Sequence, residues 1–169
     1  MFNTRRSIRR YKDEQIEDEK LSSILANTLF SPTSKNRRPW EFIVVRDKDS
    51  IDLISKVRAT GSAFLKGAPC VILVIGDPTT SEVWIEDTSI AAYAIQLAAH
   101  EQGLGTCWVQ IRLREHSGDI TASDYLKEKF GIPGHKEVAC AIGIGYPDEE
   151  KAPHELTEEL LSKLQYEKY

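Results

Sequence analysis

The sequence predicts an α+β fold, in which helices pack on a central sheet. Apolar runs of strand length, such as residues 71–75, alternate irregularly with segments whose apolar residues recur at helical spacing. No GxGxxG turn joins a strand to a helix, so a Rossmann dinucleotide site is not predicted. The 169 residues suit a single domain, residues 1–169, which is long enough to bury its own core.

The elements are predicted in the following order. Helices are expected at residues 15–29, 48–58, 86–102, 122–130 and 157–163, and strands at residues 40–46, 71–75, 106–109 and 137–146. Asp13 is expected to cap the first helix, and residues 30–39, which contain two prolines, are expected to form a loop. The helix at 86–102 is rich in alanine and apolar nearly all round, which predicts burial in the core or between subunits.

Composition excludes several classes of protein. A hydrophobic share of 41% and a charged share of 28% are typical of a soluble globular chain, and a net charge of -4 argues against a general affinity for nucleic acid. No signal-peptide pattern opens the sequence, and no apolar run is long enough to span a bilayer. Cys70, Cys107 and Cys140 are widely spaced in apolar surroundings, so small core residues in a reducing cytoplasm are expected and a metal site is not.

The first candidate site is the basic segment Arg5-Arg6-Ser7-Ile8-Arg9-Arg10. Guanidinium forks bind phosphate oxygens in bidentate fashion, and an extended backbone places alternate residues of this segment on one face. On charge alone, a solvated basic tail is an equally good interpretation. The apolar Ile8 and the following Tyr11 favour a segment that packs against the protein.

Two further segments have polar or glycine-rich character. Residues 31–40 form a proline-bounded loop with small hydroxyl side chains and Asn36, which suits either a polar ligand or ordinary capping of the preceding helix. Residues 103–108, GLGTCW, allow backbone amides to approach a planar ligand or simply end the helix. No nucleophile–base pair stands out, and the histidines lack metal-ligand spacing. That absence suits a protein whose redox cofactor performs the chemistry.

Taken together and in order, these segments resemble the nitroreductase-like family of FMN proteins. The matching stretches are RRSIR near residue 5, SPTSKNRRPWEF near residue 31, AAHEQGLGTCW near residue 98, GIGYP near residue 143 and the YEKY ending. The resemblance covers essentially the whole chain. It implies a mostly antiparallel sheet and a homodimer with an extended, swapped terminus. It also implies two FMN sites at the dimer interface and a central dimer helix at residues 86–102.

The resemblance also implies the residues of the flavin site. Those expected to hold the phosphate and pyrimidine edge are Arg5, Arg6, Ser7 and Arg9. Those expected to line the ring and ribityl chain, from the other subunit's side, are Pro32, Thr33, Ser34 and Asn36. Backbone amides of Gln110 and Ile111 are expected at the flavin N5 edge, where many members have glycine, and Arg38 stands where a glutamine is common. Lys151 and His154 are the candidates for the cationic pair that completes the phosphate site.

The predicted function is that of an FMN-dependent NAD(P)H oxidoreductase with a ping-pong mechanism. NADH or NADPH would reduce FMN, and a small electron-poor acceptor such as a nitroaromatic, quinone or enone would then take its place. No side chain is expected to act as a catalytic residue. A flavin-binding or sensing module without turnover is the alternative, and a basic-arm interaction protein is a third interpretation. The polar stretch at residues 108–122 predicts a short cover over the flavin and an open substrate face.

Overall fold

A computed structural model describes residues 1–169. Its main sheet has four strands in the order β1-β2-β6-β3, and every neighbouring pair is antiparallel. The strands are β1 (Trp40–Val45), β2 (Cys70–Gly76), β6 (Glu137–Gly145) and β3 (Gly105–Gln110). The central strand β2 is buried along its whole length, as expected for a strand with both faces covered.

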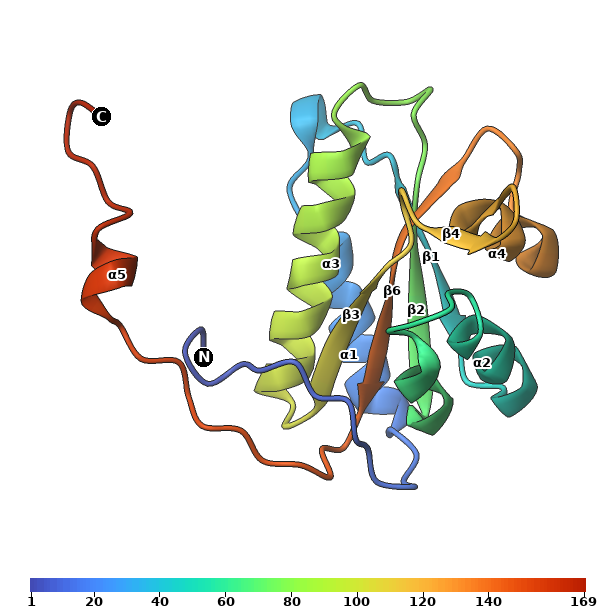
Figure 1. Ribbon diagram of the computed structural model, residues 1–169, viewed down its shortest axis with the longest axis horizontal. Helices are drawn as coiled ribbons and strands as arrows, with labels where there is room; N and C mark the ends of the chain where they lie inside the picture. The colour runs from blue at the N-terminus through green and yellow to red at the C-terminus, as the bar shows by residue number, and fades with distance from the viewer.

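Helices cover both faces of this sheet (Figure 1). Helices α1 (Asp18–Leu29) and α3 (Trp84–Glu101) pack on one face, and α2 (Lys48–Ser55) and α4 (Ala122–Phe130) on the other. The core is accordingly divided by the sheet into two apolar clusters, one containing Ile24 and Ile95, the other Ile54 and Leu126. The α+β fold with a mostly antiparallel sheet is therefore confirmed.

The predicted elements are all present, with shifted ends in most cases. Helix α4 has the predicted bounds, because Thr121 accepts a hydrogen bond from the Asp124 amide and Gly131, with φ +65°, ends it. The prediction that Asp13 caps α1 was wrong: Glu17 precedes that helix, and Asp13 lies 3.8 Å from Lys48 Nζ instead.

Four short elements were not predicted. The 3₁₀ helix η1 (Ser34–Asn36) lies inside the 30–39 loop, and η2 (Ala63–Gly67) precedes β2. A small hairpin of β4 (Glu115–Ser117) and β5 (Ile120–Thr121) follows β3. Segments of this length carry too few residues to show a hydrophobic period.

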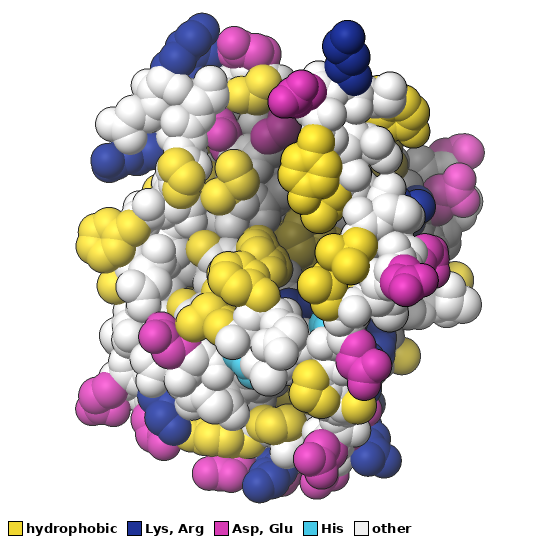
Figure 2. Space-filling view, turned by 90° about the vertical axis from the view of Figure 1, so that its left-hand side faces the viewer, with side chains coloured by type: hydrophobic (Ala, Val, Ile, Leu, Met, Phe, Trp, Pro, Cys, Tyr) yellow, Lys and Arg dark blue, Asp and Glu magenta, His cyan; other side chains and the backbone are white.

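The C-terminal tail, residues 152–169, contains only the short helix α5 (Glu158–Leu161) and extends away from the body of the chain (Figure 1). Figure 2 shows the side of the molecule from which the tail projects, where hydrophobic side chains gather around a hollow. The large apolar side chains that the tail and α3 expose are Leu156, Leu160, Leu161, Leu164, Tyr166, Tyr169, Ile90 and Tyr93. The predicted burial of α3 thus holds for its sheet-facing side, while Ile90 and Tyr93 have no cover in the single chain.

No helix is both long and apolar enough to cross a membrane. No group of His, Cys, Asp and Glu side chains is arranged to hold a metal ion. The three cysteines are free and buried, two of them fully.

Candidate functional site

The N-terminal arm, residues 1–12, pairs with the free edge of β3 at Ser7 and Ile8, while residues 1–4 are exposed. Ser7 forms a parallel bridge with Thr106, and the Ile8 amide donates to the Thr106 carbonyl at 2.9 Å. Ile8 is buried against Gly105, where an added Cβ would lie 2.8 Å from the Ile8 Cβ. Glycine at this position therefore allows the arm to approach the strand closely, and the packed arm predicted from Ile8 is present.

Tyr11 fixes the far end of the arm. Its hydroxyl donates to the Ile8 carbonyl at 2.7 Å and approaches the Gly143 carbonyl at 3.3 Å, and burial raises the pKa of this phenol well above its usual value. The Lys12 amide donates to the Tyr146 carbonyl at 2.9 Å. The arm is thus tied to both β3 and the segment that follows β6.

That following segment supplies a carboxylate that sequence reasoning missed. Glu149 Oε1 accepts hydrogen bonds from the Arg9 amide at 2.5 Å and the Arg10 amide at 3.2 Å. These bonds, the one from Arg9 foremost, lower the pKa of Glu149. Sequence distance concealed the contact, because about 140 residues separate the partners and nothing local marks Glu149.

Cationic residues of the arm and of the segment that follows β6 meet around a cavity of about 200 Å³. Its lining includes Arg5, Arg6 and Lys151 together with residues 103–106. Lys151 Nζ donates to the Ser7 carbonyl at 2.5 Å, and Arg6 Nη1 to the Ala152 carbonyl. The sequence-predicted block after α3 is therefore adjacent to the predicted phosphate residues.

Arg5 carries the clearest sign of a missing ligand. Its Nε atom is buried and has no hydrogen-bond partner. A buried donor without a partner costs about 1–3 kcal/mol, and an anionic oxygen would remove that cost. Glu149 and Glu150 also line the cavity, but neither accepts a hydrogen bond from Arg5.

Ser7 and Arg9 are not among the residues that line this cavity. The Arg9 guanidinium carbon is 5.9 Å from the centroid of the Phe64 ring on η2. Burial raises the pKa of the nearby Cys107 thiol, while Arg9 and Lys151 act to lower it. The cations of the arm therefore do not all line this cavity. His154 joins it only through its backbone amide, which donates to the Asn3 carbonyl at 2.7 Å.

The 30–39 loop occupies the opposite end of α3. The Ser34 amide donates to Asp87 Oδ1 at 2.9 Å, in the first turn of α3, and Asp87 is buried. Thr33 Oγ1 accepts from the Arg38 amide at 3.1 Å, and Arg38 Nε donates to Asn36 Oδ1 at 3.0 Å. Pro32 and Asn36 are exposed. The loop is thus held in shape by its own polar contacts and by α3.

Within one chain, the arm and the 30–39 loop do not meet. Thr4 Oγ1 lies 2.8 Å from His100 Nε2 near the end of α3, whereas Ser34 is bound to Asp87 near its start. Thirteen helical residues separate these two anchors, which corresponds to about 20 Å. The single chain therefore brings Arg5, Arg6 and Lys151 together around one cavity and leaves Asn36 apart.

The end of β3 offers one backbone amide to a ligand. The Thr106 carbonyl accepts a hydrogen bond from the Ile8 amide of the arm, and the Gln110 carbonyl accepts one from Arg58 Nη1 at 3.3 Å. Both carbonyls therefore point away from β6. Since the N–H and C=O of one residue point the same way in an antiparallel strand, the Gln110 amide faces this free edge. Ile111 is fully buried, and its amide donates to the Ala139 carbonyl at 3.3 Å. Of the two predicted residues, only Gln110 therefore faces the edge.

Comparison with known proteins identifies the family. The model described as "Nitroreductase family" matches residues 3–146, and the chain belongs to this family of oxidoreductases. An Archaeoglobus fulgidus relative named "Putative NADH dehydrogenase/NAD(P)H nitroreductase" is 37% identical over 89% of this chain and 86% of its own length.

Solved structures show the same fold. An FMN-dependent nitroreductase from Clostridium difficile R20291 is 46% identical, covers 99% of this chain and 98% of its own, and has a TM-score of 0.97. A Desulfovibrio desulfuricans structure described as a "putative nitroreductase in complex with fmn" is 28% identical over 98% of this chain and 94% of its own, with a TM-score of 0.78.

Proposed function

We propose that this protein is an FMN-dependent NAD(P)H oxidoreductase that acts on small electron-poor acceptors by a ping-pong mechanism. The observation that carries the proposal is the buried, unpartnered Nε of Arg5 in a cationic cavity beside the glycines that follow α3. Family membership and the relatives described as FMN-dependent or in complex with FMN support it.

The residues that line this cavity fit an FMN phosphate. Arg5, Arg6 and Lys151 provide guanidinium and ammonium donors around one cavity, and phosphate oxygens are the acceptors that such donors bind best. About 13 Å of β3 separates this end from Gln110, a distance that the ribityl chain and ring can bridge. Bound FMN would accept a hydride from NADH or NADPH and pass electrons to a nitroaromatic, quinone or enone.

Each group of residues has its own part in that chemistry. The arm would bind the phosphate and orient the cofactor along β3, and the Gln110 amide would donate to the N5 edge. A cation near N1 stabilises negative charge on the reduced ring, and Arg9, held over Phe64, is the candidate. No side chain of this chain is assigned a covalent role.

We further propose that two copies complete each site. The 30–39 loop lies about 20 Å from the arm along α3, so a second chain with its α3 antiparallel would bring Pro32, Thr33, Ser34 and Asn36 to the arm of the first. The exposed Ile90 and Tyr93 of α3 and the leucines of the tail offer the apolar surface that a homodimer would cover. The separation of the arm from the 30–39 loop and the exposed apolar side chains are both consistent with a dimer interface in which the termini are exchanged.

Anaerobic titration of the purified protein tests the enzymatic part. The protein is expected to bind FMN stoichiometrically. The flavin absorbance should be bleached by NADH or NADPH and restored by an acceptor. A protein that takes up no FMN would overturn the cofactor assignment. Tight FMN binding without reduction by either nicotinamide would instead favour the flavin-binding module.

Substitution of Arg5 tests the site itself. Arg5→Ala removes a charged donor from the phosphate cavity, so FMN affinity should fall by about tenfold or more. Fluorescence titration of the flavin-free protein measures this, with Lys48→Gln as a control that removes one positive charge elsewhere. Equal FMN affinity in Arg5→Ala and the control would contradict the assignment.

Oligomeric state is tested by sedimentation of the full chain. A dimer is expected, and Tyr93→Lys should convert it to monomer because the substitution places a charge on the exposed side of α3. A monomeric wild-type protein that binds FMN normally would overturn the two-copy site.

A further inference from the structure

A cavity of about 250 Å³ lies beyond the end of β3. It is lined by two stretches, residues 58–60 after α2 and residues 114–117 of the β4–β5 hairpin. None of these residues belongs to the phosphate site described above. The hairpin is one of the elements that the sequence did not predict, and it stands where a short cover over the flavin was expected.

Two arginines in this lining have no acidic partner. Arg58 and Arg114 take part in no ion pair, and Glu115, the only carboxylate in the lining, takes part in none either. Arg114 Nη1 donates only to the carbonyl of its neighbour Leu113, at 3.3 Å. Each guanidinium has five N–H donors, so most remain available to a ligand.

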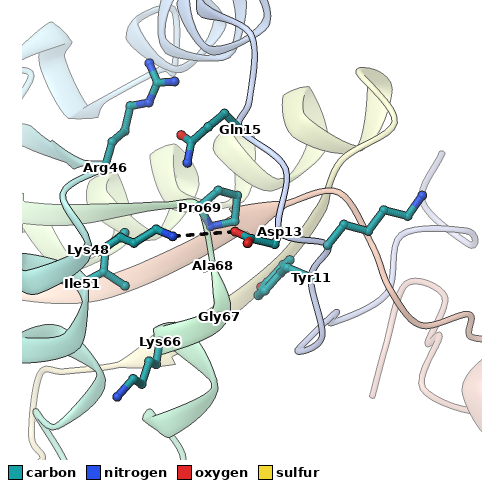
Figure 3. A pocket seen from close by; sticks show the side chains of 11 residues that line it. Tyr11, Asp13, Gln15, Arg46, Lys48, Ile51, Lys66, Gly67, Ala68 and Pro69 are labelled. Atoms are coloured by element: carbon teal, nitrogen blue, oxygen red, sulfur yellow. Dashed lines mark ion pairs between the residues drawn. The ribbon is translucent and has the colours of Figure 1, made fainter.

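The larger cavity of the molecule, about 290 Å³, shows the opposite arrangement (Figure 3). Lys48 points toward Asp13 across its centre, at 3.8 Å. Arg46 lies 2.5 Å from Asp18, and Lys66 is 3.1 Å from Asp52. Three of the four cations in this lining thus have a carboxylate partner within the chain, and Lys12 is the one that has none. Unpaired arginines, rather than the number of basic residues, therefore distinguish the cavity at the end of β3 from this larger cavity.

Arg58 is held in place by its surroundings. Its Nη1 donates to the Gln110 carbonyl at 3.3 Å, and its own carbonyl accepts from Ser62 Oγ at 3.3 Å. Gly61, with φ +85°, lies beside the guanidinium, since a Cβ added there would be 3.9 Å from Arg58 Cζ. An arginine fixed in this way loses little side-chain freedom when it binds an anion.

The hairpin side of the cavity is also fixed. His116 Nδ1 lies 3.0 Å from the Val57 carbonyl, and its ring stacks on Tyr125 with a centroid distance of 3.9 Å. The Ala122 amide donates to the Arg114 carbonyl at 2.8 Å. The hairpin side of the cavity is therefore ordered by contacts that do not use the Arg114 guanidinium, and on the other side Arg58 uses one of its five N–H donors to hold Gln110.

We propose that Arg58 and Arg114 bind an anionic oxygen group, carboxylate or phosphate, of a molecule that reacts at the flavin. This inference rests on the proposed function, because the hydrogen bond from Arg58 to Gln110 places the cavity beside the strand end assigned to the flavin ring. The anionic group belongs either to the acceptor or to the pyrophosphate of the nicotinamide donor. In both cases the two arginines set the charge preference of the reaction.

Binding without turnover is the first test. Benzoate and benzamide are titrated into the oxidised flavoprotein, and the flavin difference spectrum and calorimetry report the dissociation constants. Benzoate should bind about tenfold more tightly than benzamide, as a charge-assisted hydrogen bond to arginine predicts. Arg114→Gln should abolish most of that preference, Arg114→Lys should retain part of it, and Lys48→Gln should leave it unchanged.

The two half-reactions then identify the source of the anion. Photoreduced protein is mixed with 4-nitrobenzoate or 4-nitrobenzamide, and oxidised protein with NADH, each without oxygen. Loss of the 4-nitrobenzoate preference in Arg114→Gln assigns the site to the acceptor, and slower reduction by NADH assigns it to the donor. The same measurements are made on Arg58→Gln if that variant folds. If it does not fold, the test depends on Arg114, whose side chain is exposed.

Equal binding of benzoate and benzamide, with both half-reactions unchanged in Arg114→Gln protein that holds a full complement of FMN, would overturn the inference. A protein that binds no FMN is a separate outcome, which removes the proposed function. Calorimetric titration of that flavin-free protein with benzoate would then decide whether the anion site exists alone.

Discussion

The two ends of the chain are both extended, and they differ in what holds them. The N-terminal arm is fixed by its own chain, through the buried Ile8, the Tyr11 hydroxyl and the Glu149 carboxylate. The C-terminal tail has apolar side chains that are largely exposed, such as Leu156, which is 76% exposed. An extended segment is thus fixed by its own chain where its apolar residues are buried, and it lacks that anchor where they are exposed.

The largest expected effect comes from removing the anchor of the arm. Ile8→Ala should lower the free energy of unfolding by about 2 kcal/mol or more, since buried apolar volume is lost and a cavity remains. Leu161→Ala in the tail should change it by less than about 0.5 kcal/mol in dilute protein, where no partner covers the tail. Urea unfolding of both variants measures the difference, and equal costs would remove the distinction between the two ends.

A smaller effect is expected from overpacking the contact between Ile8 and Gly105. Gly105→Ala places a Cβ 2.8 Å from the branched Ile8 Cβ, which cannot swing aside, so overpacking should cost about 1–3 kcal/mol and reduce bound FMN. Gly134→Ala is the matched control, because nothing lies within 4 Å of its added Cβ. Thermal unfolding measures the stability of both variants, and their flavin content measures bound FMN. If Gly105→Ala changed neither quantity, the arm would be able to move aside.

The pH dependence of stability probes the carboxylate that holds the arm. The pKa of Glu149 is lowered in the folded protein, first by the hydrogen bond from the Arg9 amide. The contribution of Glu149 to stability is therefore fully present above its pKa in the unfolded chain, about 4.3. That contribution is lost as pH falls through its pKa in the folded protein. Wild type should therefore lose more stability than Glu149→Gln between about pH 6 and pH 3. Parallel pH profiles from urea unfolding would contradict this role.

The smallest effect is expected at the exposed pair of Lys48 and Asp13. The atoms are 3.8 Å apart, and both side chains are more than four-fifths exposed. Lys48→Gln should change the free energy of unfolding by less than about 0.5 kcal/mol. A larger loss in urea unfolding would show that the segment between the arm and α1 depends on this ion pair.

Sequence periodicity predicted the long elements well and the site only in part. The apolar run of β2 and the alanine-rich α3 can be recognised from neighbouring residues alone. The same holds for the two ends of α4, at Thr121 and Gly131. The contact between Glu149 and the arm is invisible to such reasoning, because it joins distant segments through backbone amides. Arg58 had no local signal either: only the fold places it against Gln110.

Helix α3 has one more consequence. It holds the arm at one end and the 30–39 loop at the other. If two chains share each site as proposed, cofactor affinity becomes a function of protein concentration. Dilution below the dissociation constant of the dimer would release FMN, and FMN would in turn favour assembly.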